Sequence, residues 1–234
     1  MQEAARAFHD QPEKAEDTLF LLEHENVVTT TRSGGRNFLR TNEQALAADG
    51  IRLVEATRGG DITFHGRGQL VGYPIVRLPF MEGAPAGRVD LLKYLRTLET
   101  ALVQSCVSLG LSGAHTQAER TGVWVPLPAE APASEAQTAK LIAIGVGVKR
   151  GITRHGFAFN LNTPLEEFTQ HIVPCGLVGH SVTSMDRIWS SERDAGFPAL
   201  PEIAQTVAER LAAGLGLQAP PKTDFASIPS ALTR

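Results

Sequence analysis

Apolar residues recur at helical spacing in two stretches of the chain. Near the C-terminus, Ile203, Val207 and Leu211 fall on one stripe and predict an amphipathic helix. A second, longer stripe in residues 88–110 also predicts a helix and consists of Leu91, Leu95, Leu98, Leu102, Cys106 and Leu109. Because Cys106 lies on this apolar stripe, we expect it to be a buried thiol that acts as a small hydrophobic residue.

Four other segments have the β-branched and apolar composition of strands. Residues 51–57 (IRLVEAT) and 69–78 (QLVGYPIVRL) predict two strands on either side of a glycine-rich loop, residues 58–68. Residues 139–148 (AKLIAIGVGV) and 151–162 (GITRHGFAFNLN) predict another pair, joined by a tight turn. Strands of this kind around two or three helices indicate an α+β fold with a mixed sheet.

A short helix is predicted in TPLEEFTQHI. Thr163 has the side chain of an N-cap, Pro164 suits the first helical position, and Glu166 completes a capping box. The helix should run to about Ile172, because Pro174 cannot continue it.

Cys175 lies just beyond this predicted helix, between Pro174 and Gly176. Proline removes a backbone donor and glycine loosens the chain, so we expect this thiol on a turn, where it is available for chemistry. A helix C-terminus disfavours a thiolate, and a nucleophilic Cys175 would therefore need a cation from elsewhere. Lys140, which enters an apolar strand, is a better candidate than Lys149, which belongs to a Lys-Arg pair typical of a solvated face.

Two segments share the pattern Ile-Thr-x-His-Gly: DITFHGRG, with His65, and GITRHGFA, with His155. Glycine permits close approach of a ligand, and imidazole offers a donor or an acceptor, so we expect two His-Gly turns that line one cavity. A pair of hydrogen-bonded structural histidines is the alternative. The loop at residues 58–60 (Arg-Gly-Gly) adds backbone amides that could hold an oxygen-rich group.

Composition limits the classes of function. The chain of 234 residues is 42% hydrophobic, and we expect one domain over residues 1–217, an exposed loop over 126–138, and a poorly ordered tail over 218–234.

A net charge of −3 argues against nucleic-acid binding. The absence of a leader-like start or a long apolar run predicts a cytoplasmic protein without membrane contact. Two cysteines without CxxC or HExxH spacing predict no disulfide framework and no metal site. Residues 136–165 carry four basic residues and no acidic one, a local positive charge that suits a thiolate and an acidic partner.

The runs RGGDITFHGRGQLVGYPI, AKLIAIGV, RGITRHGFAFNLN and VPCG, in this order, resemble the signature of the octanoyltransferases of lipoate biosynthesis, also called lipoate-protein ligase B. The resemblance covers roughly residues 18–190. In that family the cysteine of the PCG motif forms an acyl-thioester and a lysine lowers the pKa of its thiol; the matching positions are Cys175 and Lys140. The resemblance also implies substrate-binding residues, which are Arg58, Gly59, Gly60, Asp61, Ile62, Thr63, Phe64, His65, Ala143, Ile144, Gly145, Gly156, Phe157 and Ala158.

The resemblance implies a ping-pong acyl transfer. Octanoyl-acyl carrier protein would acylate Cys175, and a lysine of a lipoyl domain, in a 2-oxoacid dehydrogenase or the glycine-cleavage H protein, would then accept the octanoyl group. A thioester is already activated, so no nucleotide, metal or other cofactor is expected. The implied fold is the catalytic domain shared by biotin and lipoate protein ligases.

Some features depart from the family pattern. Phe64 and Arg67 replace an expected tyrosine and proline. No counterpart of the family's first strand precedes MQEAARAF, as a start codon assigned too late would explain.

Three alternatives to an octanoyltransferase remain open. An ATP-dependent lipoate or biotin ligase would need a nucleotide loop, yet the chain has no GxxxxGK[ST] and no glycine directly before a lysine. A cysteine hydrolase would need a histidine oriented by an acidic or amide side chain beside Cys175, and neither His171 nor His180 has an evident partner of this kind. A non-catalytic lipoyl-domain binder would not need Cys175.

Overall fold

A computed structural model gives the fold of most of the chain. Cys175 lies outside the described residues, as do most of the predicted loop at 126–138 and all but the first residue of the predicted tail at 218–234. The structure describes residues 7–8, 10, 15–32, 35–83, 88–127, 137–173, 181–192 and 196–218, without the side chains of 167, 168 and 190–192.

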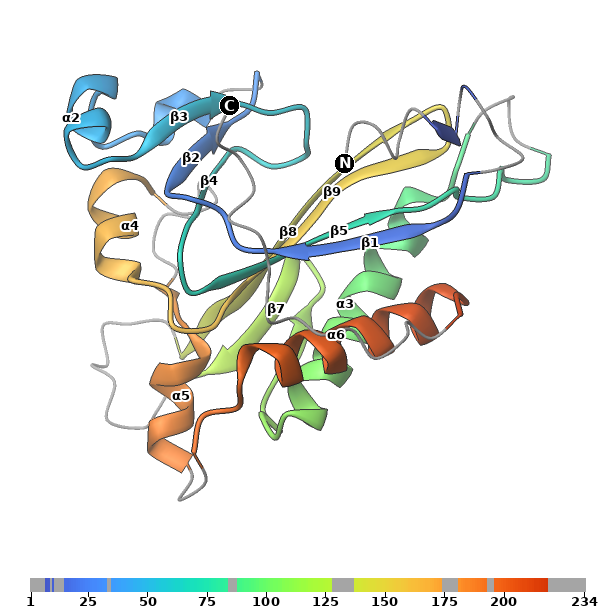
Figure 1. Cartoon of the computed structure of the whole chain (residues 1–234). Coiled ribbons are helices and arrows are strands. Elements are labelled where there is room, and N and C mark those ends of the chain that lie inside the picture. Colours follow the sequence, from blue (N-terminus) through green and yellow to red (C-terminus); the bar gives the residue numbers. More distant parts are fainter. Residues whose placement is uncertain are drawn as a thin grey trace.

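A large sheet forms the centre of the fold (Figure 1). Its strand order is β1-β5-β9-β8-β7-β6, with every neighbouring pair antiparallel, and β10 pairs with β8 in parallel. A tight turn joins β8 to β9 as predicted; its residues Arg150 and Gly151 have φ angles of 53° and 79°. The strands are β1 (Thr18–Leu22), β5 (Gln69–Ile75), β6 (His115–Gln117), β7 (Arg120–Pro126), β8 (Thr138–Lys149), β9 (Ile152–Asn160) and β10 (Ser181–Val182).

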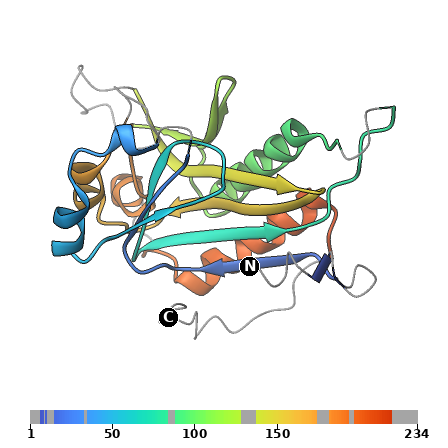
Figure 2. The ribbon, with the colours of Figure 1, turned by 90° about the horizontal axis from the view of Figure 1, so that it is seen from above.

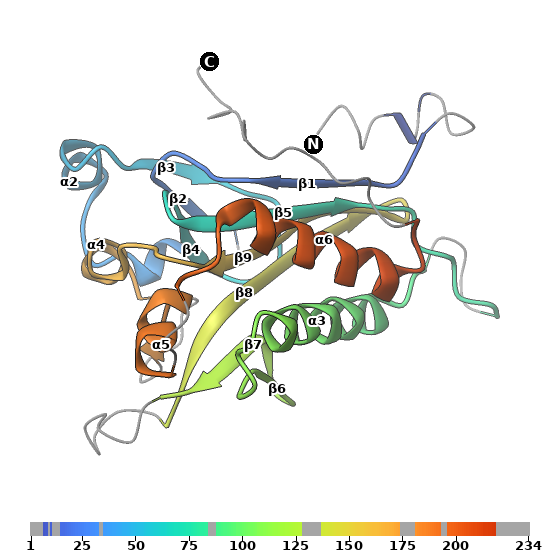
Figure 3. The same cartoon turned by 60° about the horizontal axis from the view of Figure 1, so that its bottom comes forward.

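The two predicted amphipathic helices, α3 (Leu91–Ser108) and α6 (Leu200–Leu215), lie side by side on one face of this sheet (Figures 1 and 3). Most residues of the predicted stripes join residues of the sheet in one hydrophobic core. Leu91, the first member of its stripe, is 40% exposed and is not part of this core. Cys106 is fully buried there, and burial raises the pKa of its thiol to about 12. This thiol is therefore a packing group, which confirms the prediction for Cys106.

A smaller sheet, in the order β3-β2-β4, lies at one end of the long strands (Figure 2). The prediction of a loop over residues 58–68 is partly wrong, because Ile62 and Phe64 enter the core of this small sheet and Ile62–His65 forms a strand. The mixture of antiparallel and parallel strands with packed helices confirms the α+β fold class. The remaining elements are β2 (Val27–Thr30), β3 (Arg52–Glu55), β4 (Ile62–His65), η1 (Gly35–Phe38), α2 (Glu43–Ala48), α4 (Leu165–His171) and α5 (Met185–Glu192).

The predicted capping box in front of α4 is not formed as expected. The helix begins at Leu165, and the hydroxyl of Thr163 donates to the carbonyl oxygen of Gly68, 2.9 Å away. The carboxylate of Glu166 instead forms an ion pair with Arg187 on α5. Both side chains that the local pattern assigned to helix capping, Thr163 and Glu166, therefore interact with residues distant in sequence instead.

Candidate functional site

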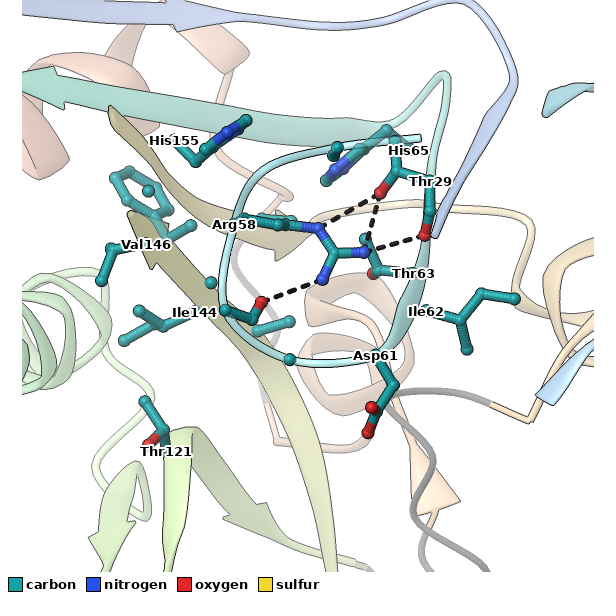
Figure 4. Close-up of a pocket in the computed structure, with 18 of the residues that line it drawn as sticks. Thr29, Arg58, Asp61, Ile62, Thr63, His65, Thr121, Ile144, Val146 and His155 are labelled. Atoms are coloured by element: carbon teal, nitrogen blue, oxygen red, sulfur yellow. Dashed lines mark hydrogen bonds between the residues drawn. The ribbon is translucent and has the colours of Figure 1, made fainter. Parts of the chain in front are cut away.

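A cavity of about 660 Å³ lies between the small sheet and strands β8 and β9 of the large sheet (Figure 4). The segment after β3, the start of α3 and the turn between β6 and β7 complete its walls. Leu91 and Leu95, the first members of the predicted helical stripe, line this cavity. The size and the apolar lining suit a small organic ligand with a hydrocarbon portion.

Arg58 fixes one wall of the cavity. Its guanidinium donates to the carbonyl and hydroxyl oxygens of Thr29, each 2.8 Å away, and to the Gly59 carbonyl, 3.0 Å away (Figure 4). The Gly59 amide in turn donates to the Val146 carbonyl on β8 at 2.8 Å. Gly145 permits this contact, because a Cβ there would lie 3.1 Å from the Gly59 carbonyl oxygen. The predicted Arg-Gly-Gly loop therefore lies directly against β8.

His65 and His155 both line the cavity (Figure 4). His65 Nδ1 lies 2.8 Å from Gln69 Oε1, while the amide nitrogen of Gln69 donates to the oxygens of Phe64 and Asn160. Since Gln69 Oε1 can only accept, Nδ1 of His65 carries the proton and Nε2 keeps a lone pair. Burial lowers the pKa of His65 to about 3, so the ring is neutral at physiological pH.

The second histidine has a strained backbone and belongs to an aromatic cluster. His155 has a φ of 60°, and burial followed by the charges of Arg58 and Arg154 lowers its pKa to about 4. Its ring lies edge-on to Tyr73, whose hydroxyl is 2.7 Å from His24 Nε2. The sequence reasoning missed His24, which stands in no motif, and assigned no role to Tyr73, because the two side chains meet only through the pairing of distant segments.

Lys140 is the buried cation of the site. The residue is 7% exposed, and its Nζ donates to the Thr121 carbonyl at 3.1 Å and lies 4.8 Å from the centre of the Trp124 ring. Trp124 is the register partner of Lys140 on β7, and Val182 of β10 is its partner on the other side. The lysine lines the cavity and is held in a largely desolvated position between two strands.

The structure brings most of the expected site residues to one cavity. Phe64 is the exception among those described, because its side chain is buried in the core of the small sheet. His171 has a partner that the sequence did not reveal: its Nε2 lies 3.1 Å from the Asp49 carboxylate, away from the cavity lining. The cavity-lining members are Arg58, Gly59, Gly60, Asp61, Ile62, Thr63, His65, Lys140, Ala143, Ile144, Gly145, Gly156, Phe157 and Ala158.

In the described part of the chain, no three histidine, cysteine or acidic side chains are grouped as metal ligands would be. None of the described helices combines the length and apolar character needed to cross a membrane.

Comparison with known proteins identifies the family to which the chain belongs. The model of the lipoyl protein ligase A/B catalytic domain matches residues 1–207. The chain is 43% identical to an octanoyltransferase of Acidobacterium capsulatum over 171 residues, which are 73% of this chain and 67% of that protein. It is 42% identical to the octanoyltransferase of Koribacter versatilis and 45% identical to that of Nocardia farcinica, each over 73% of this chain and over 62% and 60% of those proteins. The matched region thus spans about two thirds or less of these relatives.

Solved structures agree on the fold. A lipoate-protein ligase A bound with ATP superposes with a TM-score of 0.67 at 15% identity, covering 93% of this chain and 79% of that one. The bipartite lipoate protein ligase of Thermoplasma acidophilum has a TM-score of 0.65 at 15% identity, with coverage of 94% and 81%. The chain therefore belongs to the lipoyl protein ligase A/B catalytic domain family, and within it to the octanoyltransferases whose motifs it resembles.

Proposed function

We propose that this protein transfers an octanoyl group from octanoyl-acyl carrier protein to a lysine of lipoyl domains, through a thioester on Cys175. The observation that carries the proposal is the buried ammonium of Lys140 in the wall of a largely apolar cavity. Such a cavity suits an acyl chain, and a desolvated cation beside it suits a thiolate. The identity to proteins named octanoyltransferase supports the same reaction. We expect the reaction to take place in the cytoplasm.

The reaction divides into two balanced steps. In the first, the Cys175 thiolate attacks the thioester carbonyl of octanoyl-carrier protein, and the carrier thiol leaves with a proton from Lys140. In the second, the amine of the lipoyl-domain lysine attacks the enzyme thioester, an amide forms, and Cys175 is released as the thiolate. Lys140, neutral after the first step, takes up the proton that the amine loses.

Strand register supports the pairing of Cys175 with Lys140. β10 begins at Ser181, six residues after Cys175, and its Val182 pairs with Lys140. The amide of Thr183 also donates to the Lys140 carbonyl, 3.0 Å away. The chain that carries the cysteine is therefore joined, within a few residues, to the strand position that carries the lysine.

The surface around the β8–β9 turn suits an acidic partner. Lys149 and Arg150 are exposed at this turn, and Phe80, 56% exposed, packs beside Gly151. The turn continues the two strands that line the cavity. Positive side chains around an exposed aromatic ring favour docking of an acidic carrier protein or lipoyl domain.

Intact-mass spectrometry after mixing with octanoyl-carrier protein tests the reaction. We expect one octanoyl adduct that maps to Cys175, is absent from Cys175→Ala, and disappears when a lipoyl domain is added. Cys106→Ala is the matched control and should keep the adduct, because that thiol is buried in the helical core. No adduct on the wild-type protein, together with adenylate formation from ATP and lipoate, would instead support an ATP-dependent ligase.

The role of Lys140 has its own test, the pH dependence of iodoacetamide labelling at Cys175. Lys140→Ala should move the labelling profile to higher pH, because the thiolate loses its neighbouring cation. Lys140→Arg should keep part of the labelling yet lose most turnover, since guanidinium does not exchange its proton. Lys149→Ala, at the exposed turn, is the control and should label as wild type. An unshifted profile in Lys140→Ala would remove the lysine from the mechanism.

A further inference from the structure

Glu99 is a fully buried carboxylate outside the lining of the cavity. It lies on α3, its side chain is 1% exposed, and both of its oxygens have partners. Oε2 accepts a hydrogen bond from Arg96, 2.6 Å away, and Oε1 accepts one from the backbone amide of Gly122, 2.9 Å away. A buried acid is costly unless its charge is well compensated, so its position calls for a reason.

The Gly122 amide belongs to the same peptide group as the carbonyl that receives Lys140. The Thr121 carbonyl accepts from Lys140 Nζ at 3.1 Å, and the Gly122 N–H donates to Glu99. In a trans peptide these two groups point in opposite directions, so the carboxylate and the ammonium lie at opposite ends of one planar dipole. Each charge polarises the peptide in the sense that strengthens the other hydrogen bond.

The residue at position 122 makes this arrangement possible. Gly122 has a φ of 129°, which a residue with a side chain rarely adopts. A Cβ there would lie 2.6 Å from the Ile142 carbonyl oxygen and 3.4 Å from Cε of Lys140. Glycine thus lets the peptide lie directly against the lysine side chain.

We propose that Glu99 is a positioning residue for Lys140, acting through the Thr121–Gly122 peptide. The carboxylate holds the Thr121 carbonyl in the orientation that fixes the ammonium, and its charge strengthens the hydrogen bond from Lys140 through the shared peptide group. This inference rests on the proposed function, since it concerns the lysine of that mechanism. The alternative is that Glu99 only ties α3 to β7, in which case its effect would not depend on Lys140.

A double-mutant cycle separates the two roles. Glu99→Gln keeps the size of the side chain and an acceptor oxygen but removes the charge. We expect it to slow iodoacetamide labelling of Cys175 near neutral pH by about tenfold, as for loss of a charge-assisted hydrogen bond. In a Lys140→Ala background the same substitution should add almost nothing, because its target is gone. Equal slowing in both backgrounds, or wild-type labelling in Glu99→Gln, would overturn the proposal.

Arg96→Gln is the matched control. It removes the ion pair to Oε2 and the hydrogen bond from Arg96 to the Ala118 carbonyl, but it leaves the hydrogen bond from the Gly122 amide to Glu99 and provides a shorter amide donor on the same face of α3. We expect labelling within about twofold of wild type. Failure of the proposed function has a different signature: if Lys140→Ala itself leaves labelling and turnover unchanged, the lysine has no role, whatever Glu99 does.

A second measurement leaves Glu99 in place and so does not depend on the folding of its variants. In wild type the amide proton of Gly122 should resonate downfield, as for a bond to a carboxylate. Lys140→Ala should move it upfield, because the polarising cation on the same peptide is lost, whereas the Val125 amide, further along β7, should not move. An unchanged Gly122 resonance would show that the two charges are not coupled.

Discussion

Replacing His65 by glutamine should make the stability of the protein less sensitive to acid. Burial lowers the pKa of His65 from 6.5 to about 3, so the folded protein holds this ring neutral where the unfolded chain would protonate it. Glutamine keeps an amide donor for Gln69 Oε1, the present partner of Nδ1, but does not titrate. The substitution therefore removes one proton-binding difference between the two states.

The size of the effect follows from the two pKa values. Well above pH 6.5 neither state binds the proton, and the contribution of His65 to the pH dependence is absent. As the pH falls below 6.5, the unfolded chain takes up a proton that the folded protein excludes, so stability is lost until the pH approaches about 3. Well below pH 6.5 the free energy of unfolding falls by about 1.4 kcal/mol per pH unit, and around pH 6.5 it falls less steeply because the unfolded ring is only partly protonated. Between about pH 7.5 and pH 5.5 the wild type should therefore lose about 1.4 kcal/mol in total that His65→Gln keeps.

Urea unfolding at several pH values measures this difference. The free energy of unfolding of each protein is plotted against pH, and the wild-type curve should fall more steeply below pH 6.5. His24 and His155 also have lowered pKa values, but both remain in the variant, so their contribution cancels in the comparison. Cys106→Ala is the control: it loses about 1 kcal/mol of packing and should give a curve parallel to wild type. Parallel curves for wild type and His65→Gln would refute the reasoning.

Two further predictions concern the docking surface and the close packing of the central strands. Reversing the charges of Lys149 and Arg150 should raise KM for the carrier protein by about tenfold at low salt with kcat unchanged, and equal salt dependence of wild type and variant would discard this surface. Gly156→Ala should lower the free energy of unfolding by about 1–3 kcal/mol, because its Cβ would overlap the Gly72 carbonyl oxygen on β5. Gly196→Ala, whose Cβ would have no atom within 4 Å, should unfold like wild type in the same denaturation experiment.

Local periodicity was enough to predict the framework of the fold. The stripe that includes Cys106 became α3, and the apolar runs on either side of Arg150 became β8 and β9 with the expected turn between them. These elements are set by spacing within one segment, because a 3.6-residue or two-residue repeat presents one apolar face to any core. The order of four motifs also indicated the family, because each motif is a short contiguous segment that can be recognised without the tertiary structure.

Contacts between distant segments were beyond the reach of that reasoning. Ile62 and Phe64 became part of a strand only because Val27–Thr30 lies beside them, and the Thr163 hydroxyl turned to Gly68 because folding brought that carbonyl within reach. A local pattern cannot show which of several possible partners a polar group will meet when the chain closes.

The site divides in the same way. Sequence alone singled out Lys140 as a cation in an apolar strand and two histidines as cavity residues. Only the tertiary structure decided that Glu99 and Lys140 lie at the two ends of one peptide, because the pairing depends on how α3 packs against the start of β7. Their separation of some forty residues along the chain carries no signal in spacing or composition. Charges that far apart in sequence become coupled only when packing excludes water from the space between them.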